Sequence, residues 1–457
     1  MSNQQYHLIK RKLKSFLPHI VLCFFCLNSF AQSPIIGNYH IYFGSLHNHS
    51  NYSADAKGKP DSAYIFAKNT SKLDFLGLSE HCIYLTESNW DSLKIAAKSA
   101  TKDSVFTAFY GFEWSSSSNF GHISIFNTDS FTTVLKSSTS TFLQICNWIE
   151  LHNGIAFFNH PGRENSNGTE FMHFETAPIN NIVGMELWNK ANGFSVYYQN
   201  DGYFNNDTNK GFFDEALRRG WRIGASGSED NHWATWGQYS NYRLAILAKA
   251  NTHKDLTEAL LHRRFYSTLD KNLALSFKID SSVMGDSIFE GKHLLQIKAF
   301  DVDSELFTKF VLIKNGDTSQ IWQTNSKNIS IDDSINCKKG EYYYIIASQE
   351  DGDQAISSPI FIGNKKPQII DTVKTNIKIG IDNIHISPNP FNEYITISNP
   401  ESEEITIKII SSTGNVIYNS ENIIDKAIKI VTSDYPIGIY FISIIRKENS
   451  TTYKLVK

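Results

Sequence analysis

Residues 41–49 read IYFGSLHNH, an apolar run that ends in two histidines. The run predicts a buried β-strand, and in an extended strand residues two apart point to the same side. The imidazoles of His47 and His49 can therefore reach one metal ion. Six further potential ligands follow at strand-end positions later in the chain. Together these residues predict a multinuclear metal site.

Strand-like and helix-like segments alternate from residue 39 to about residue 269. Repeated strand–helix–strand units predict parallel strands joined by crossover helices. Seven or eight such units in about 230 residues predict a distorted (β/α)7-type barrel, whose active site forms at the C-terminal strand ends, where the candidate ligands stand. The predicted strands are residues 41–46, 75–78, 107–112, 123–126, 155–158, 182–187, 222–225 and 243–248, and the predicted helices are residues 61–69, 89–99, 141–152, 214–219 and 252–264.

The pattern changes after the barrel, which we place at residues 32–270. Short alternating segments without a convincing helix predict a β-sandwich over residues 271–363. Residues 364–383 are polar and basic and predict a linker, and turn signals between short strands predict a second all-β domain over residues 384–457.

The first 31 residues predict a secretory signal peptide. Four basic residues between positions 10 and 14 precede an apolar stretch over residues 16–27, and small residues lead to Ala31. The stretch is short for a bilayer of about 30 Å and is broken by Pro18, so we expect cleavage after Ala31 and no stable membrane anchor. Removing four of 43 basic and none of 46 acidic residues changes the formal net charge from −3 to −7, which argues against general nucleic-acid binding.

Three cysteines remain after the signal peptide: Cys82, Cys146 and Cys337. An odd, sparse set does not predict a disulfide framework. Cys82 follows His81 directly and is either a thiolate ligand or, more commonly for such a residue, a small buried hydrophobe.

The candidate metal ligands are imidazoles and carboxylates, a set that suits zinc, iron or manganese. Each one alone is more often a hydrogen-bonded surface or core side chain, so their joint occurrence carries the prediction. The candidates are His47, His49, Asp55, His81, Glu113, His122, His160, Asp230 and His232.

The motifs around these residues resemble the PHP (polymerase and histidinol phosphatase) superfamily of metal-dependent hydrolases. The resemblance covers about residues 39–362, and Trp188-Asn189, residues 263–268 and the following sandwich resemble its carbaryl-hydrolase-like branch. The superfamily motifs are Leu46-His47-Asn48-His49-Ser50, Asn51-Tyr52-Ser53-Ala54-Asp55, residues 75–81, the strand end at Glu113, His160-Pro161 and Asp230-Asn231-His232.

The resemblance implies two or three divalent metal ions as cofactors. Asp55 is the least secure ligand, because Ala56 stands where the family usually has glycine. The alternative is a capping aspartate for the helix near Asp61, which would leave a dinuclear centre. The implied sets are His47, His49, Glu113 and Asp230 for the first metal, His122 and His160 with the bridging Glu113 for the second, and Asp55, His81 and His232 for the third.

Hydrolysis is the reaction that such a centre supports. Neighbouring cations lower the pKa of a bridging water from 15.7 towards about 7 and stabilise developing negative charge on the substrate. Glu113 is thus a catalytic candidate as the bridging ligand. Arg163 is a second candidate, as a cation for an anionic phosphate, with a surface ion pair to Glu164 or Glu170 as the alternative.

Several aromatic residues near the candidate ligands have two possible roles. They either form a stacking wall for a substrate or pack in the core, and we expect at least one at the pocket rim. Glu186 ends a strand and either faces the same pocket or is structural. The aromatic residues are Trp188, Trp233, Trp236 and Tyr239.

The last 70 or so residues resemble a type IX secretion sorting domain. The resemblance rests on Ser387-Pro388-Asn389-Pro390-Phe391, residues 412–414, residues 436–440 and the basic C-terminal residues 454–457. It implies that type IX secretion machinery exports the protein to the cell surface or beyond. The alternative is an ordinary β-sandwich binding module.

We therefore predict a secreted metal-dependent phosphoesterase with an anionic small-molecule or oligomeric ester as substrate. One alternative is hydrolysis of a carboxylic or carbamate ester or an amide at the same metals. Another is a non-catalytic surface binding protein with structural metals, although nine mixed ligands exceed the four that a structural zinc site needs.

Overall fold

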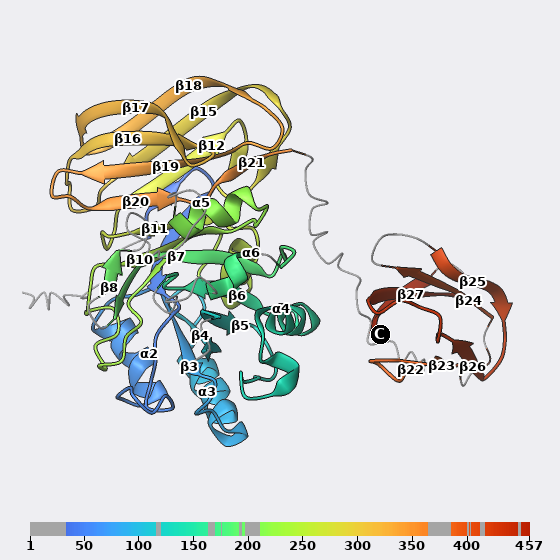
Figure 1. Ribbon diagram of the computed structural model, residues 1–457. Coiled ribbons are helices and arrows are strands. Elements are labelled where there is room, and N and C mark those ends of the chain that lie inside the picture. The colour runs from blue at the N-terminus through green and yellow to red at the C-terminus, as the bar shows by residue number, and fades with distance from the viewer. Residues whose placement is uncertain are drawn as a thin grey trace, which may run out of the picture. The chain divides into compact units, whose positions relative to one another are not determined.

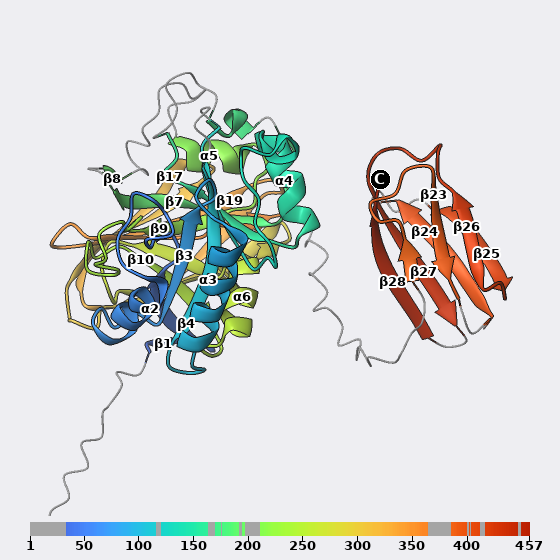
Figure 2. The same ribbon diagram turned by 90° about the horizontal axis from the view of Figure 1, so that it is seen from below.

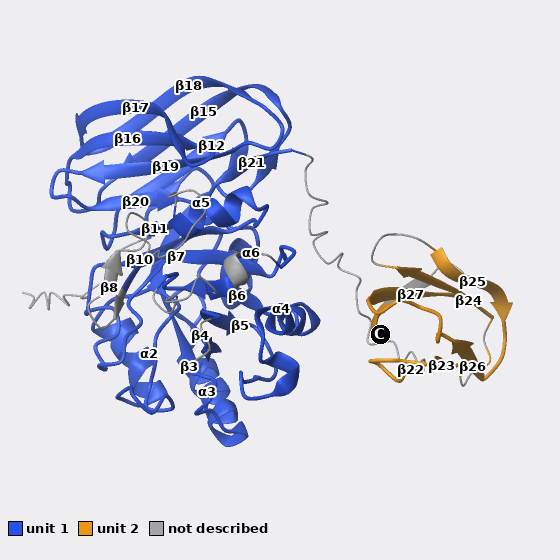
Figure 3. Ribbon diagram, viewed as in Figure 1, with its two compact units in different colours: residues 1–366 blue, residues 367–457 orange. Residues whose placement is uncertain are grey.

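The computed structural model describes most of the chain between residues 33 and 457. The predicted signal peptide, Arg163 and the predicted linker lie outside the described residues. The chain divides into two units, Met1–Lys366 and Pro367–Lys457, coloured separately in Figure 3. The described residues are 33–115, 120–162, 170–174, 176–191, 194–196, 211–363, 385–399, 402, 404–411, 416–446 and 449–457.

A mixed β-sheet forms the frame of the first unit (Figure 1). The neighbours β2–β3, β3–β4, β6–β7 and β7–β9 are parallel, whereas β4–β5, β5–β6 and β10–β2 are antiparallel. The strands are β1 Ile35–Ile36, β2 Tyr39–Ser45, β3 Phe75–His81, β4 Thr107–Ser115, β5 His122–Phe126, β6 Ile155–Asn159, β7 Ile182–Ala191, β8 Phe194–Val196, β9 Gly224–Ser228 and β10 Arg243–Ala248.

The prediction of a distorted (β/α)7-type barrel is confirmed only in part. The predicted apolar segments form strands, but the antiparallel pairs interrupt the succession of parallel units. An antiparallel neighbour needs only a short connection, whereas a parallel neighbour needs a crossover that is usually helical. Fewer helices than strands therefore occur in this part of the described chain.

The helices flank the strands of the sheet, as Figures 1 and 2 show. Side-chain N-caps begin three of them: Thr86 accepts the Asn89 N–H at 3.2 Å, Thr252 caps through Asp255, and Thr141 forms a capping box with its N3 residue. The helices are α2 Pro60–Asn69, α3 Glu87–Ala100, α4 Phe142–Leu151, α5 Gly211–Arg218 and α6 His253–Leu261, with short 3₁₀ turns η1 Ser137–Thr139 and η2 Glu170–Phe174.

Large aromatic side chains fill the core between helices and sheet. Trp90, Trp114 and Trp221 are each at most 1% exposed, and full burial of such a side chain stabilises the fold by about 2–3 kcal/mol. Cys82 and Cys146 pack in the same cluster. Burial raises the pKa of the Cys82 thiol, which favours its interpretation as a small buried hydrophobe.

The β-sandwich continues directly from the strands of the mixed sheet. β11 pairs with β10 on one side and β20 on the other, so one sheet runs through both parts, and β13-β12-β15-β18 form the opposing sheet. Ile41 and Phe43 of β2 share a hydrophobic core with Phe277 and Tyr343 of the sandwich. The strands are β11 Phe265–Thr268, β12 Ala274–Ile279, β13 Ser282–Val283, β14 Ser287–Ile288, β15 Gly291–Phe300, β16 Phe307–Lys314, β17 Asp317–Ser326, β18 Asn328–Cys337, β19 Tyr342–Gln349, β20 Gln354–Ser357 and β21 Ile360–Ile362.

The second unit consists of two antiparallel sheets around a core rich in isoleucine. Ile395, Ile407 and Ile442 are fully buried there. Within the described residues of the whole chain, no helix combines the length and apolar character needed to cross a bilayer. The strands are β22 His385–Ser387, β23 Tyr394–Ser398, β24 Ile405–Ser411, β25 Val416–Ile423, β26 Ala427–Val431, β27 Ile439–Arg446 and β28 Asn449–Val456.

Asp214 of α5 bonds two tyrosines of β19, so its substitution tests how the sandwich is attached to the helix. Its carboxylate is 3% exposed and accepts hydrogen bonds from the hydroxyls of Tyr342 and Tyr344, both at 3.1 Å. We expect Asp214→Ala to lower the free energy of unfolding by about 2–4 kcal/mol, because two buried hydroxyls lose their acceptor. Tyr344→Phe should cost only about 1 kcal/mol. Urea unfolding followed by tryptophan fluorescence measures both, and equal stability of Asp214→Ala and wild type would contradict the assignment.

Candidate metal centre

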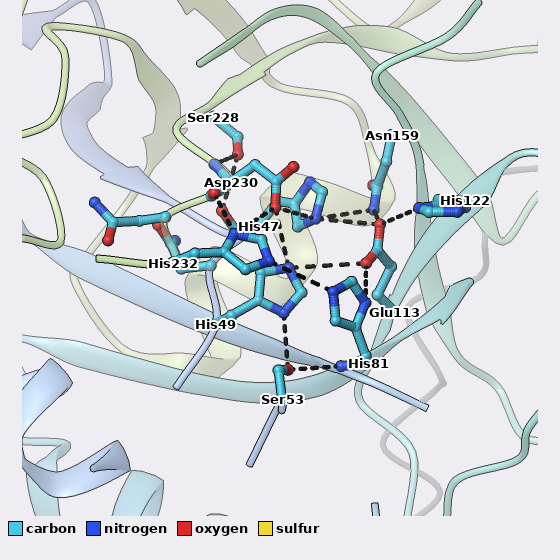
Figure 4. A network of polar contacts seen from close by, with 12 residues as sticks. His47, His49, Ser53, His81, Glu113, His122, Asn159, Ser228, Asp230 and His232 are labelled. Carbon is cyan, nitrogen blue, oxygen red and sulfur yellow. Dashed lines mark hydrogen bonds and ion pairs between the residues drawn. The ribbon is translucent and has the colours of Figure 1, made fainter. Parts of the chain in front are cut away.

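The nine predicted ligands come together at one edge of the mixed sheet. Figure 4 shows seven of them: His47, His49, His81, Glu113, His122, Asp230 and His232. His47 and His49 follow β2, His160 follows β6, and Asp230 and His232 follow β9. The others are His81 at the end of β3, Glu113 within β4, His122 at the start of β5 and Asp55 in the loop before α2.

His122 corrects the prediction that all ligands stand at C-terminal strand ends. It is the first residue of β5, which runs antiparallel to β4 and β6. Reversal of the strand direction brings the N-terminus of β5 to the edge where its neighbours end. His122 therefore joins the cluster from the N-terminal end of its strand, and its role as a ligand stays a prediction.

A backbone bridge joins the two loops that carry most ligands. Asn48 and Asn231 form a parallel β-bridge. The N–H of His49 donates to the carbonyl of Asn231 at 3.0 Å, and the N–H of Asp230 donates to the carbonyl of His47 at 3.1 Å. The loop after β2 is thus held in register with the loop after β9.

The backbone is strained at two of the ligands. His160 has φ 26° and Asp230 has φ 46°, a region that costs a residue other than glycine about 1–3 kcal/mol. Such conformations persist where surrounding contacts determine them, and they cluster at functional sites.

Glu113 lies at the centre of the cluster and is fully buried. Both carboxylate oxygens have imidazole neighbours, so one side chain connects ligands from β2, β3, β5 and β6 (Figure 4). Oε1 lies 3.3 Å from His47 Nε2, 3.1 Å from His122 Nδ1 and 3.4 Å from His160 Nε2, and Oε2 lies 2.8 Å from His81 Nδ1 and 3.7 Å from His49 Nε2.

The electrostatics keep this carboxylate ionised. Burial raises the pKa of Glu113, but His122, His47 and His81 outweigh burial and hold that pKa well below the usual value. For His47, burial lowers the pKa, while Asp230, Glu186 and Glu113 raise it well above its usual value. Positive charge on His47 is thus stabilised by the neighbouring carboxylates of Asp230, Glu186 and Glu113.

Asp230 forms the second acidic point of the site. Its Oδ1 lies 3.1 Å from His47 Nε2 and 3.0 Å from His49 Nε2, and its Oδ2 lies 4.0 Å from His160 Nε2. Burial, then His81, lower the pKa of His49 to about 3.

Asp55, His81 and His232 form the more exposed side of the site. The Nε2 atoms of the two histidines lie 3.4 Å apart, and Asp55 Oδ2 lies 3.4 and 3.6 Å from them. A hydrogen bond from His81 lowers the pKa of Asp55 to about 2. Asp55 does not cap the following helix, since the N-cap of α2 is Lys59, which makes no side-chain cap.

A second layer of polar residues orients the ligands. Glu186 accepts from His47 Nδ1 at 2.8 Å and from the N–H of His160 at 2.7 Å. Ser53 Oγ lies 3.0 Å from His49 Nδ1 and donates to buried Glu80 at 2.7 Å. With Nδ1 held in this way, Nε2 of each imidazole faces the centre, as in histidines that bind metals.

Sequence reasoning did not identify Ser53, Glu80 or Asn159 as site residues. Asn159 Nδ2 donates to Glu113 Oε1 at 2.8 Å and lies 3.3 Å from His47 Nε2. The only signal in the sequence is position, because Asn159 precedes His160 and Glu80 precedes His81. Polar neighbours of a ligand are the residues to examine for this role.

The ligand geometry fits bound cations. His49 Nε2 is buried without a hydrogen-bond partner, although it faces Asp230 and Glu113. Mixed imidazole and carboxylate donors suit zinc, manganese or iron. Four groups of ligand atoms within 4.8 Å of one another occur here: His47-His49-Glu113, His47-His160-Asp230, Glu113-His122-His160 and His49-His81-His232.

Two of the predicted aromatic residues belong to the core and two reach the surface. Trp188 and Trp236 are 1% and 2% exposed, and Trp236 Nε1 donates to the carbonyl of His49 at 2.8 Å. Trp233 is 50% exposed beside His232, and Tyr239 is 36% exposed. Tyr84, not predicted, is 45% exposed with its ring centroid 6.3 Å from that of His81.

Comparison with known proteins identifies the C-terminal unit. Residues 385–457 match the family described as a secretion system C-terminal sorting domain. This confirms the predicted resemblance and indicates type IX secretion to the cell surface or the extracellular space.

Two solved structures are similar to parts of the chain. A two-domain protein from Bacteroides vulgatus, described as containing a predicted PHP-like metal-dependent phosphoesterase, shares 14% identity and covers 71% of this chain and 97% of its own, with a TM-score of 0.42. An immunoglobulin-like β-sandwich protein from Bacteroides vulgatus shares 21% identity and covers 16% of this chain and 82% of its own, with a TM-score of 0.15. With TM-scores this low, the assignment of chemistry rests on this chain's own residues.

A curated relative from Chlamydia muridarum, described only as an uncharacterized protein, is 25% identical over 190 residues. That match spans 35% of this chain and 30% of the relative. The carbaryl-hydrolase-like branch stays a prediction.

Glu186 provides a test of the site that does not depend on activity. We expect Glu186→Gln to weaken metal binding by about 10- to 100-fold, because the amide orients His47 less firmly than the carboxylate does. Competition with a chromophoric chelator measures the affinity. Glu258→Gln, on α6, is the matched control and should bind metal like the wild type. Unchanged affinity in Glu186→Gln would contradict the orienting role.

Proposed function

We propose that the protein is a secreted metal-dependent phosphoesterase. The observation that carries the proposal is the convergence of nine ligand-type side chains around the buried carboxylates of Glu113 and Asp230. In this proposal the mixed sheet is a distorted (β/α)7-type barrel, and the sandwich over residues 271–363 supports it.

The ligand sets follow the contacts between side chains. His47, His49, Glu113 and Asp230 would hold one cation, and His122 and His160 a second that shares Glu113. Asp55, His81 and His232 would complete a third set at the exposed side. Asp55 is the most exposed of these side chains, at 58%, which makes the third set the most open to solvent.

The chemistry divides between the cations and the chain. When bound, divalent cations supply activated water at neutral pH and stabilise negative charge on a substrate oxygen. Glu113 stays ionised and connects the ligand sets, while Glu186 and Ser53 orient His47 and His49. These residues preorganise the site, so that little rearrangement accompanies the reaction.

A lysine beside the exposed third set of ligands, Lys57, favours an anionic substrate. The side-chain Nζ of Lys57 lies 5.0 Å from the ring centroid of Trp233. The backbone N–H of Lys57 donates to the carbonyl of His232 at 3.0 Å. A lysine here can attract a phosphate, and Trp233 and Tyr84 offer ring faces to the rest of the substrate. Arg163 stays a prediction for the same role.

A carboxylic or carbamate ester or amide hydrolase is the second candidate. The exposed rings of Trp233 and Tyr84 favour it, because an acyl substrate needs apolar contact rather than charge.

The test compares hydrolysis of p-nitrophenyl phosphate, bis-p-nitrophenyl phosphate and p-nitrophenyl acetate by the full chain loaded with manganese or zinc. We expect a phosphoester to be the best substrate and Glu113→Gln to reduce kcat/KM by at least about 100-fold. Lys57→Ala should raise KM for the phosphoester more than for the acetate. Preference for the acetate would select the acyl hydrolase, and absence of turnover in a folded, metal-loaded wild type would favour a binding protein.

A further inference from the structure

Three loops of the first unit bring acidic side chains together away from the metal centre. Asp270 lies between β11 and β12, Asp301 and Glu305 between β15 and β16, and Asp353 between β19 and β20. Oxygen atoms of Asp270, Asp301 and Glu305 all lie within 4.8 Å of one another. Asp270 is 8% and Asp301 6% exposed, so this is not an ordinary surface patch of acids.

Among the described residues, the negative charge of this cluster has no counter-ion within ion-pair distance, although the charge of Asp270 acts on the buried cation Arg243. No ion pair to lysine, arginine or histidine involves Asp270, Asp301 or Glu305 there. Burial, then Asp351, Asp270 and Asp301, raise the pKa of Glu305 to about 7. Burial and Asp351 raise the pKa of Asp353 to about 6. The carboxylates therefore disfavour one another's charge, and either a proton on Glu305, which hydrogen-bonds Asp270, or a bound cation relieves the repulsion.

Gln349, at the end of β19, points to a ligand independently of these charges. The side chain is 3% exposed, and its Nε2 donates to Asp301 Oδ2 at 3.1 Å and Glu305 Oε2 at 3.2 Å. Its Oε1 is buried and has no hydrogen-bond partner. A half-turn of the terminal amide would exchange the two atoms and turn the amide oxygen towards the carboxylates, an orientation that a cation between them would favour.

We propose that Asp270, Asp301, Glu305 and Gln349 form a calcium-binding site at the junction of barrel and sandwich. The donors are all carboxylate or amide oxygens, which suit a hard cation such as calcium rather than zinc. Backbone N–H groups of Leu273 and Glu305 already hold one oxygen each of Asp270 and Asp301, which orients the remaining oxygens. Extracellular modules bind calcium at about 10⁻⁴ to 10⁻³ M, in keeping with the export of this protein.

Bound calcium would link two loops and the end of β19, which neighbour the two sheets of the sandwich. The β11–β12 loop comes from the strand that continues the barrel sheet, and the β15–β16 loop joins the two sheets of the sandwich. We therefore expect calcium to stabilise the first unit without taking part in hydrolysis.

Thermal unfolding of the full chain at pH 8, in EDTA and then in calcium at about 10 mM, tests the site. We expect calcium to raise the wild-type Tm by roughly 2–8 °C. Asp301→Asn and Glu305→Gln should lose this rise, yet should have a Tm in EDTA equal to or above that of the wild type, since each removes repulsion. Two controls should keep the rise: Asp332→Asn on β18, and His49→Ala in the metal centre.

Each outcome decides between specific explanations. A wild type without a calcium-dependent rise overturns the site, and so does a rise that persists in both Asp301→Asn and Glu305→Gln. A rise lost in His49→Ala assigns the effect to the metal centre instead. If Asp301→Asn and Glu305→Gln both have a higher Tm than the wild type, in EDTA and equally in calcium, the cluster shares protons and binds no cation. None of these outcomes depends on the hydrolase proposal, because no measurement uses turnover.

Discussion

Two buried carboxylates, Glu113 and Asp230, impose the main physical constraint on this protein. An isolated buried charge is costly, and it is tolerated only when paired and hydrogen-bonded. Here the compensation comes from imidazoles on two strands, β3 and β5, and on the loops that follow β2 and β6, so these segments of the mixed sheet must lie in register around the two carboxylates. His160 and Asp230 adopt positive φ angles, so the contacts of their side chains outweigh the conformational preference of their backbone.

The backbone bridge between Asn48 and Asn231 transmits this constraint to the fold. It holds the ends of β2 and β9 together, although β2 pairs along its length with β10 on one side. The same β2 contributes Ile41 and Phe43 to the core shared with the sandwich. One strand therefore connects the ligand loops, the barrel and the sandwich, which explains why the described part of the first unit forms one body rather than two.

Export and metal chemistry belong to separate parts of the chain. The sorting domain forms its own unit with its own isoleucine core, whereas the ligands and the acidic cluster lie in the first unit. The two clusters of the first unit differ in chemistry: imidazoles mixed with carboxylates in one, oxygen donors alone in the other. Different donor sets select different cations, so the proposed hydrolytic centre and the proposed calcium site would bind different ions.

The sequence by itself determined most of the strand positions and the sorting domain, and it predicted the ligand types, because each is written in local patterns of period, residue chemistry and spacing. His47 and His49 could be chosen as one pair because two residues along a strand are always on one side. Only the tertiary structure decided that β5 is antiparallel, that Glu186 orients His47 across 139 positions of sequence, and that Gln349 faces Asp301 across 48. Strand pairing and burial depend on contacts between distant segments, which no local pattern specifies.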